Sequence, residues 1–177
     1  TDFSHAPAIP NPFESVQVSV NADDPDGVRS AVLRYAVDDG DFESVEMTRG
    51  VGRRLQATIP GQRSGRTVQF YVEAVDGSGH ESYFPATGPG SRALYRVQDH
   101  AAREGLHNFR ILMTEADTDR LHDPTQIMSN GRLKATVYYN ESEVFYDVGV
   151  RLKGSNAARG DANYLGYNIE FDPMQPF

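Results

Sequence analysis

Apolar and polar residues alternate along much of the first hundred residues of the chain. The alternation is regular at 16–20, 32–37 and 68–75, where apolar side chains recur at about every second position. This period is typical of strands that bury one face and leave the other in water. It predicts six strands: Glu14–Ala22, Val28–Val37, Phe42–Arg49, Arg53–Ile59, Thr67–Asp76 and Arg92–Gln98.

Short turn segments separate these strands. Glycine and aspartate cluster at 23–27, 38–41 and 76–79, where they supply the backbone angles that tight turns require. Several short antiparallel strands within ninety residues predict an immunoglobulin-like antiparallel β-sandwich. The arrangement over 12–98 resembles the immunoglobulin-like and fibronectin type III-like modules of secreted bacterial proteins, which implies a fold but no particular activity. We therefore expect a sandwich domain over residues 12–99.

The pattern changes after about residue 100. His107–Met113 predicts another strand. Thr114 followed by Asp117 has the form of a helix cap, in which the threonine oxygen accepts from the amide three residues later. A short helix should then run to about His122 and end before Pro124.

Strands dominate the last forty residues as well. The segment 134–156 predicts two strands around a tight polar turn, and Tyr167–Asp172 predicts a third. Cross-strand packing explains most of the aromatic residues in this part of the chain. They are Tyr138, Tyr139, Phe145, Tyr146, Tyr164 and Tyr167. The pattern over residues 100–177 therefore predicts a smaller β-rich α+β region. For the whole chain, the predicted fold class is mainly β.

The end of one of these strands carries a family resemblance. An Arg-x-Lys-Gly step at 151–154 is followed by a loop and then by an aromatic-x-Ile-x-Phe strand at 167–171. This order is similar to the opening of the CotH kinase-like domain, named for spore coat protein H. The resemblance implies that 100–177 is the N-terminal portion of such a domain, with the catalytic half after Phe177. The chain departs from the family at 164–166, where Tyr-Leu-Gly replaces a Lys-Lys-Ser step.

The Arg-x-Lys-Gly step supplies the candidate binding site. Alternation along a strand places Arg151 and Lys153 on one face, and Gly154 lets the backbone approach a ligand closely. The resemblance implies that the ligand is a phosphate of ATP, accompanied by magnesium, in a complete parent domain. The alternative is a solvated strand face beside a turn, and the residues alone favour that alternative.

Acidic residues suitable for holding magnesium are few in this region. Asp161, Glu170 and Asp172 are the only acids that follow the basic step, and none is assigned as a metal ligand. Phosphoryl transfer needs such ligands. We therefore expect no catalytic residue, no metal site and no cofactor in the fragment itself.

A second acidic cluster, at Asp23, Asp24 and Asp26, suggests calcium, with the loop at 38–41 as a further source of oxygen atoms. Calcium takes six to eight oxygen ligands, which a single turn does not supply. A solvated acidic turn is the simpler interpretation, and no calcium is assigned.

Composition narrows the classes of function further. The chain has no cysteine, which excludes disulfides, thiolate zinc sites and thiol nucleophiles. Its formal net charge is −8 and its basic residues are dispersed, so nucleic-acid binding is not expected. No apolar run approaches the ~20 residues that a membrane-spanning helix needs.

Two functions follow from these observations. The first is a non-catalytic structural or interaction fragment of a secreted or cell-surface multidomain protein, which binds protein partners in an extracellular assembly. The second is a part of an atypical CotH-like secreted protein kinase that binds ATP near Arg151 and Lys153. A chain that continued into paired acids able to hold magnesium would favour the second function.

Overall fold

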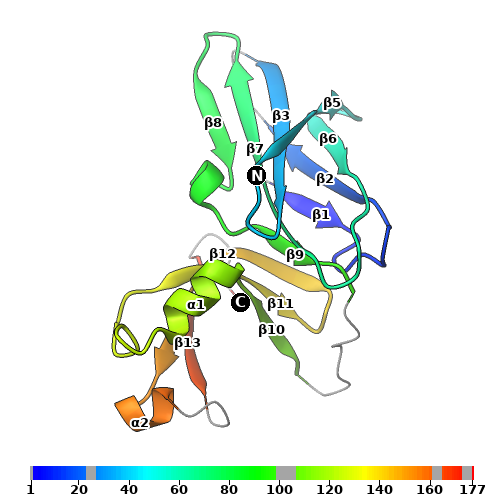
Figure 1. Cartoon of the computed structure of the whole chain (residues 1–177). Helices are drawn as coiled ribbons and strands as arrows, with labels where there is room; N and C mark the ends of the chain where they lie inside the picture. Colours follow the sequence, from blue (N-terminus) through cyan, green and yellow to red (C-terminus); the bar gives the residue numbers. More distant parts are fainter. Residues whose placement is uncertain (1, 23–26, 99–106, 161–164, 173–176) are drawn as a thin grey trace.

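The computed structural model describes residues 2–22, 27–98, 107–160, 165–172 and 177. Its strands form three sheets, two of them in a sandwich and the third beneath one end of that sandwich (Figure 1). Every strand pair in these residues is antiparallel. The mainly β fold class predicted from the sequence is confirmed.

Sheet A has the strand order β1–β2–β6–β5. Its members are β1 (Ser4–Ala6), β2 (Val16–Asn21), β5 (Thr48–Arg49) and β6 (Arg54–Ile59). Val16, Val18 and Val20 of β2 are fully buried. The alternation in the sequence therefore marks the face of β2 that packs into the sandwich.

Sheet B has the order β4–β3–β7–β8, and β9 also pairs with β7. Its members are β3 (Val28–Val37), β4 (Glu43–Glu46), β7 (Thr67–Asp76), β8 (Glu81–Phe84) and β9 (Leu94–Arg96). A single 3-10 turn, η1 (Gly88–Gly90), lies between β8 and β9. Leu33 and Phe70 from sheet B join Ile59 from sheet A in one buried apolar cluster, which is the core of the sandwich.

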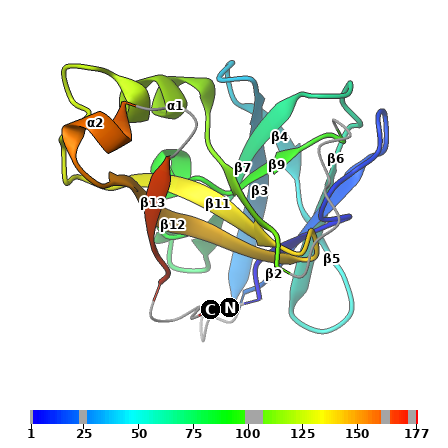
Figure 2. The same ribbon diagram turned by 90° about the horizontal axis from the view of Figure 1, so that it is seen from below.

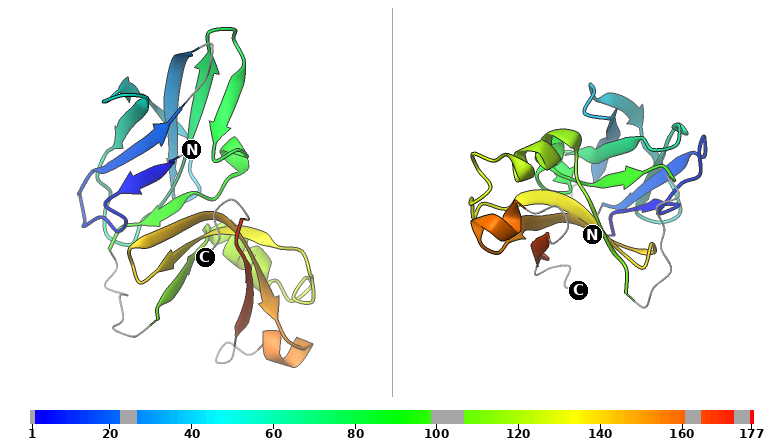
Figure 3. Two further views of the ribbon diagram at one scale, coloured as in Figure 1. Left: turned by 180° about the vertical axis from the view of Figure 1, so that it is seen from behind. Right: turned by 60° about the horizontal axis from the view of Figure 1, so that its bottom comes forward.

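Sheet C has the order β10–β11–β12–β13 and curves beneath the sandwich (Figure 3). Its members are β10 (Phe109–Leu112), β11 (Leu133–Tyr139), β12 (Glu143–Lys153) and β13 (Gly166–Glu170). The turn between β11 and β12 contains Asn140 and Glu141, with φ values of 49° and 57°. Two consecutive left-handed residues form the hairpin turn whose twist matches that of the strands.

Two short helices accompany sheet C, α1 (Glu115–His122) and α2 (Asn156–Arg159), and both lie toward one end of the sheet (Figure 2). The Thr114 hydroxyl accepts a hydrogen bond from the Asp117 amide at 3.2 Å, which confirms the predicted cap. The helix ends at His122, before Pro124, because proline has no amide hydrogen to continue it. None of the helices in the described part of the chain is long and apolar enough to span a membrane.

The sandwich and sheet C pack against each other through buried side chains. Tyr146 of β12 belongs to the same apolar cluster as the sandwich residues, and its ring lies 5.1 Å from that of Phe3. The Thr136 hydroxyl of β11 accepts from the Leu94 amide at 2.8 Å and donates to the Arg92 carbonyl at 2.5 Å. Side chains of sheet C thus complete both the core and the hydrogen bonds of β9.

One predicted strand is wrong. The sequence predicts a single strand over Phe42–Arg49, whereas the structure has β4 in sheet B and β5 in sheet A. Both sheets impose the same period of two, so local alternation does not reveal that the chain crosses between them. The pattern also missed β1 and β8, which have only three and four residues. The predicted domain boundary stays a prediction, because residues 99–106 lie outside the described part of the chain.

Candidate functional site

The basic step predicted from the sequence lies at the end of β12. Arg151 pairs with Asn168 and Lys153 pairs with Gly166 of β13. Along this strand Val150 and Leu152 are buried, while Arg151 is half-buried and Lys153 is exposed. The two basic side chains therefore share the more polar face of the strand, in the arrangement that the alternation predicted.

Gly154 follows at a φ of 110°, a conformation that side chains with a Cβ rarely adopt. A Cβ at this position would lie 3.0 Å from the Cβ of Ala158. The Gly154 carbonyl accepts a hydrogen bond from Nε of Arg159 at 2.9 Å. Glycine is thus required here by the turn into α2, whether or not a ligand approaches.

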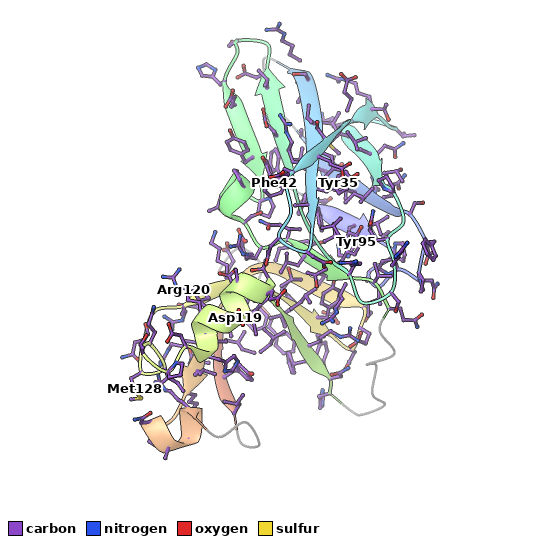
Figure 4. The ribbon with its side chains drawn as sticks, in the orientation of Figure 1. Tyr35, Phe42, Tyr95, Asp119, Arg120 and Met128 are labelled. Carbon is purple, nitrogen blue, oxygen red and sulfur yellow. The ribbon has the colours of Figure 1, made fainter. Side chains whose placement is uncertain are left out.

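Arg151 also lines a small cavity, of about 90 Å³, that the sequence did not reveal. Arg120 from α1 and Arg132 from the segment before β11 line the same cavity, and no acid is present among its described lining residues. Figure 4 marks Arg120 on α1 and Met128 on the segment that follows it. Nη1 of Arg151 donates to Oδ1 of Asn130 at 3.1 Å. The structure thus brings Arg151 together with two arginines that are 31 and 19 residues away, whereas Lys153 does not line the cavity.

The acids near the basic step are engaged elsewhere or lie outside the described residues. Glu170 forms an ion pair with Arg132 at 2.7 Å. Asp161 lies in a part of the chain that the structure does not describe. Among the described residues no group of three or more histidine or acidic side chains is placed to hold a metal ion.

The acidic turns considered for calcium are only partly described. Asp23, Asp24 and Asp26 lie outside the described residues. In the second loop the Asp38 carboxylate is paired with Arg66, and Oδ2 of Asp39 accepts from the Ala116 amide at 3.3 Å. These contacts connect the loop to the residue before β7 and to the first turn of α1.

Five aromatic rings gather at one end of sheet C, and we call them the aromatic patch. They are Phe109, Tyr139, Phe145, Phe171 and Phe177. The ring of Phe177 lies 5.0 Å from Tyr139, 5.2 Å from Phe109 and 5.5 Å from Phe171. Phe109 is nevertheless 44% exposed and Phe177 is 63% exposed. Large apolar side chains that remain in water as a group mark a surface suited to a partner.

A cavity lined mostly by apolar residues extends from this patch toward α1. It has a volume of about 490 Å³ and is lined mainly by side chains of β10, α1 and β13, including Phe109, Ile111, Leu121 and Ile169. Tyr167 lines it too and is 38% exposed. The aromatic patch and this cavity form one continuous surface, because Phe109 belongs to both.

The sequence only partly indicated this surface. It marked Tyr139 and Phe145 as part of an aromatic-rich strand pair, and cross-strand packing does account for Tyr138 and Tyr146, which are buried. It gave no sign that Phe109 and Phe177 meet them. Sixty-eight residues separate these two phenylalanines, so the only available signal was that apolar residues recur on the same face of several strands. Tyr164 lies outside the described residues.

A buried histidine holds the N-terminal strand against both parts of the protein. His5 is 7% exposed; its Nε2 donates to the Ala8 carbonyl at 3.0 Å and its Nδ1 accepts from the Tyr146 hydroxyl at 2.6 Å. The carbonyl can only accept, so the neutral tautomer with hydrogen on Nε2 satisfies both bonds. Burial lowers the pKa of His5 from 6.5 to about 4.

No protein-family model matches the chain, and no curated protein matches it. Among solved structures the chain is similar to BhCBM56, crystallised as a Br derivative, at 13% identity with a TM-score of 0.33. That alignment covers 39% of this chain and 71% of the other.

Two further solved structures are similar over more of the chain. The cycloalternan-forming enzyme from Listeria monocytogenes, in complex with pentasaccharide substrate, is 12% identical, with a TM-score of 0.41 over 87% of this chain. The cycloalternan-degrading enzyme from Trueperella pyogenes is 11% identical, with a TM-score of 0.37 over 86% of this chain. The chain spans 13% and 18% of the lengths of these two enzymes. Likenesses this distant assign neither an activity nor a ligand.

Proposed function

We propose that the chain is a non-catalytic interaction module, and that a partner protein packs on the aromatic patch. The supporting observation is the exposure of Phe109 and Phe177 within a group of five rings, in which the ring of Phe177 contacts the other four. From the sequence resemblances alone, we also propose that the parent is a secreted or cell-surface protein and that residues 100–177 belong to a CotH kinase-like domain.

Physical chemistry favours a protein as the occupant of this surface. Burying apolar area contributes roughly 25 cal/mol per Å², and aromatic side chains supply large areas at a small cost in side-chain entropy. Aromatic residues are also enriched among the side chains that carry most of the binding energy in protein interfaces. The neighbouring cavity offers space for an apolar anchor from the partner.

Site-specific crosslinking tests this proposal. A photoreactive phenylalanine analogue is placed at position 109 or, as a matched control, at Phe42, which is an exposed aromatic residue of the sandwich. The protein is illuminated in its native host, and crosslinked products are identified by mass spectrometry. We expect a discrete crosslinked protein from position 109, lost when Phe177 is replaced by serine, and no such product from position 42. Identical products from both positions would contradict the proposal.

The second candidate is nucleotide binding at Arg151, Lys153 and Gly154, as part of a CotH-like kinase with magnesium. The observation in its favour is that both basic side chains lie on one face of β12, with Arg151 beside two further arginines. Arginine binds phosphate through two parallel hydrogen bonds, and lysine adds a point charge.

Calorimetry with Mg-ATP separates the two candidates. The interaction module is expected to give no micromolar binding. Micromolar binding that disappears in the double variant Arg151→Ala, Lys153→Ala would support the nucleotide candidate over a module without a nucleotide site.

A further inference from the structure

Arg159 occupies an unusual environment at the end of α2. The residue is only 6% exposed, although arginine is almost never fully buried unless it is paired. Its Nε donates to the Gly154 carbonyl at 2.9 Å, and its Nη1 donates to the carbonyls of Ile127 and Ser129, both at 3.0 Å. The guanidinium therefore ties α2 to the segment that follows α1.

The charge of Arg159 has no counter-charge in the described part of the chain. All three hydrogen bonds go to backbone carbonyls, which are dipoles rather than anions, and no described carboxylate forms an ion pair with it. Removing a guanidinium from water without a counter-ion is unfavourable, and carbonyl dipoles offset this cost only in part. A buried cation of this kind favours the entry of an anion.

A cavity beside Arg159 gives such an anion access. It has a volume of about 360 Å³, and Arg159 forms part of its wall together with His122, Asn156 and Gly160. The other described lining residues are Pro124, Ile127 and Leu165, so no acid occurs in the described part of the wall. The imidazole and the amide offer hydrogen-bond donors, and the apolar side chains limit access of water.

We propose that this cavity binds a small oxyanion, a phosphate or carboxylate group, through the guanidinium of Arg159. Charge-assisted hydrogen bonds from a partly desolvated guanidinium are roughly twice as strong as neutral ones. The site is separate from the arginine cavity around Arg151, because the two cavities share only Ile127 among their described lining residues. The inference goes beyond the interaction module, since a partner on the aromatic patch does not require it.

The variant Asn156→Asp provides the central test. Asn156 is exposed on α2 and lines the cavity, so an aspartate there supplies a fixed negative charge without disturbing a buried contact. This carboxylate should neutralise Arg159 and exclude other anions. Asn130→Asp is the matched control: it makes the same change beside Arg151 in the other cavity.

Binding is measured by calorimetry and by the shift of Tm with inorganic phosphate or acetate, at constant ionic strength set by chloride. We expect saturable binding of at least one of the two anions to the natural chain, weakened at least tenfold in Asn156→Asp and less than threefold in Asn130→Asp. Preference between phosphate and acetate distinguishes the two ligand classes.

Two results would overturn the inference. One is the absence of saturable binding of phosphate and of acetate at concentrations up to about 50 mM, which is about 50 times a weak Kd of ~1 mM. The other is binding that Asn156→Asp does not weaken; where Asn130→Asp weakens it instead, the anion occupies the cavity around Arg151. Neither result affects the crosslinking test of the aromatic patch.

Discussion

His5 illustrates how much a single buried residue contributes at the scale of side chains. Its imidazole lies against the rings of Tyr95 and Phe70 in the sandwich, and both Tyr138 and Tyr146 of sheet C are within hydrogen-bonding distance. Burial is the largest influence on the pKa of His5 and lowers it, and the hydrogen bond to the Ala8 carbonyl opposes that shift only in part. His5 is therefore held neutral in an environment that stabilises no added charge.

Because of this residue, the free energy of unfolding should decrease as the pH is lowered. The folded protein has a pKa of about 4 at His5 and the unfolded chain one near 6.5, so the unfolded chain binds a proton more readily between these values. The stabilising contribution is complete above pH 6.5 and is lost as the pH falls toward 4, by up to ~3 kcal/mol. Urea unfolding at pH 7, 5.5 and 4 measures it.

The variant His5→Gln is the control for this prediction, because glutamine can both donate and accept a hydrogen bond but does not titrate. The free energy of unfolding of the natural chain relative to His5→Gln should decline as the pH falls. A constant difference between the two proteins across this range would show that His5 does not titrate as described.

At the scale of elements, α1 depends on its first turn. Thr114 is buried and caps the Asp117 amide, and the Asp117 carboxylate in turn accepts from Nε of Arg92 in the segment before β9. The same cap thus starts the helix and positions an acid that binds the sandwich. Acidic residues in the first turn also interact favourably with the positive end of the helix.

Replacing Thr114 with alanine should lower the free energy of unfolding by about 1 kcal/mol, because the amide of Asp117 loses its acceptor. Thr114→Ser keeps the oxygen and removes only the buried methyl group, so it should lower the free energy of unfolding less than Thr114→Ala does. Chemical denaturation of both variants checks this. Equal losses in the two variants would mean that the methyl group, and not the cap, carries the effect.

At the scale of the whole molecule, the sandwich and sheet C are joined by a continuous core. Tyr146 of β12 packs within 6.0 Å of Phe70 in β7, and the Tyr138 hydroxyl donates to the Leu94 carbonyl at 3.0 Å. Asp147, in a β-bulge with a φ of 54°, accepts hydrogen bonds from Thr87 and from the Arg92 amide. Such packing couples the unfolding of the two parts.

We expect Tyr146→Ala to reduce the free energy of unfolding by roughly 3–5 kcal/mol, as for other large aromatic residues removed from a core. The lower stability should appear as a single unfolding transition. Far-UV circular dichroism and NMR signals from both parts of the chain should report the same transition. Tyr167→Ala, at a site 38% exposed, is the control and should cost much less. Two separate transitions, with only one of them shifted, would contradict the shared core.

Several features of the fold could be predicted from local sequence. β7 begins at Thr67 and ends at Asp76, as the alternation predicted, and α1 ends at the predicted His122. The candidate site was predictable only in part. The alternation placed Arg151 and Lys153 on one face, but Arg120 and Arg132 come from segments whose positions depend on the path of the chain after α1.

The sequence by itself determined the strand periods, the buried faces and the cap of α1, because these depend on residues within a few positions of one another. The tertiary structure alone decided that β4 and β5 belong to different sheets, that Phe109 meets Phe177, and that Arg159 is buried beside a cavity. Such contacts join distant positions, and their geometry is set by how the sheets pack rather than by local preference. Both proposed binding surfaces therefore arise from packing.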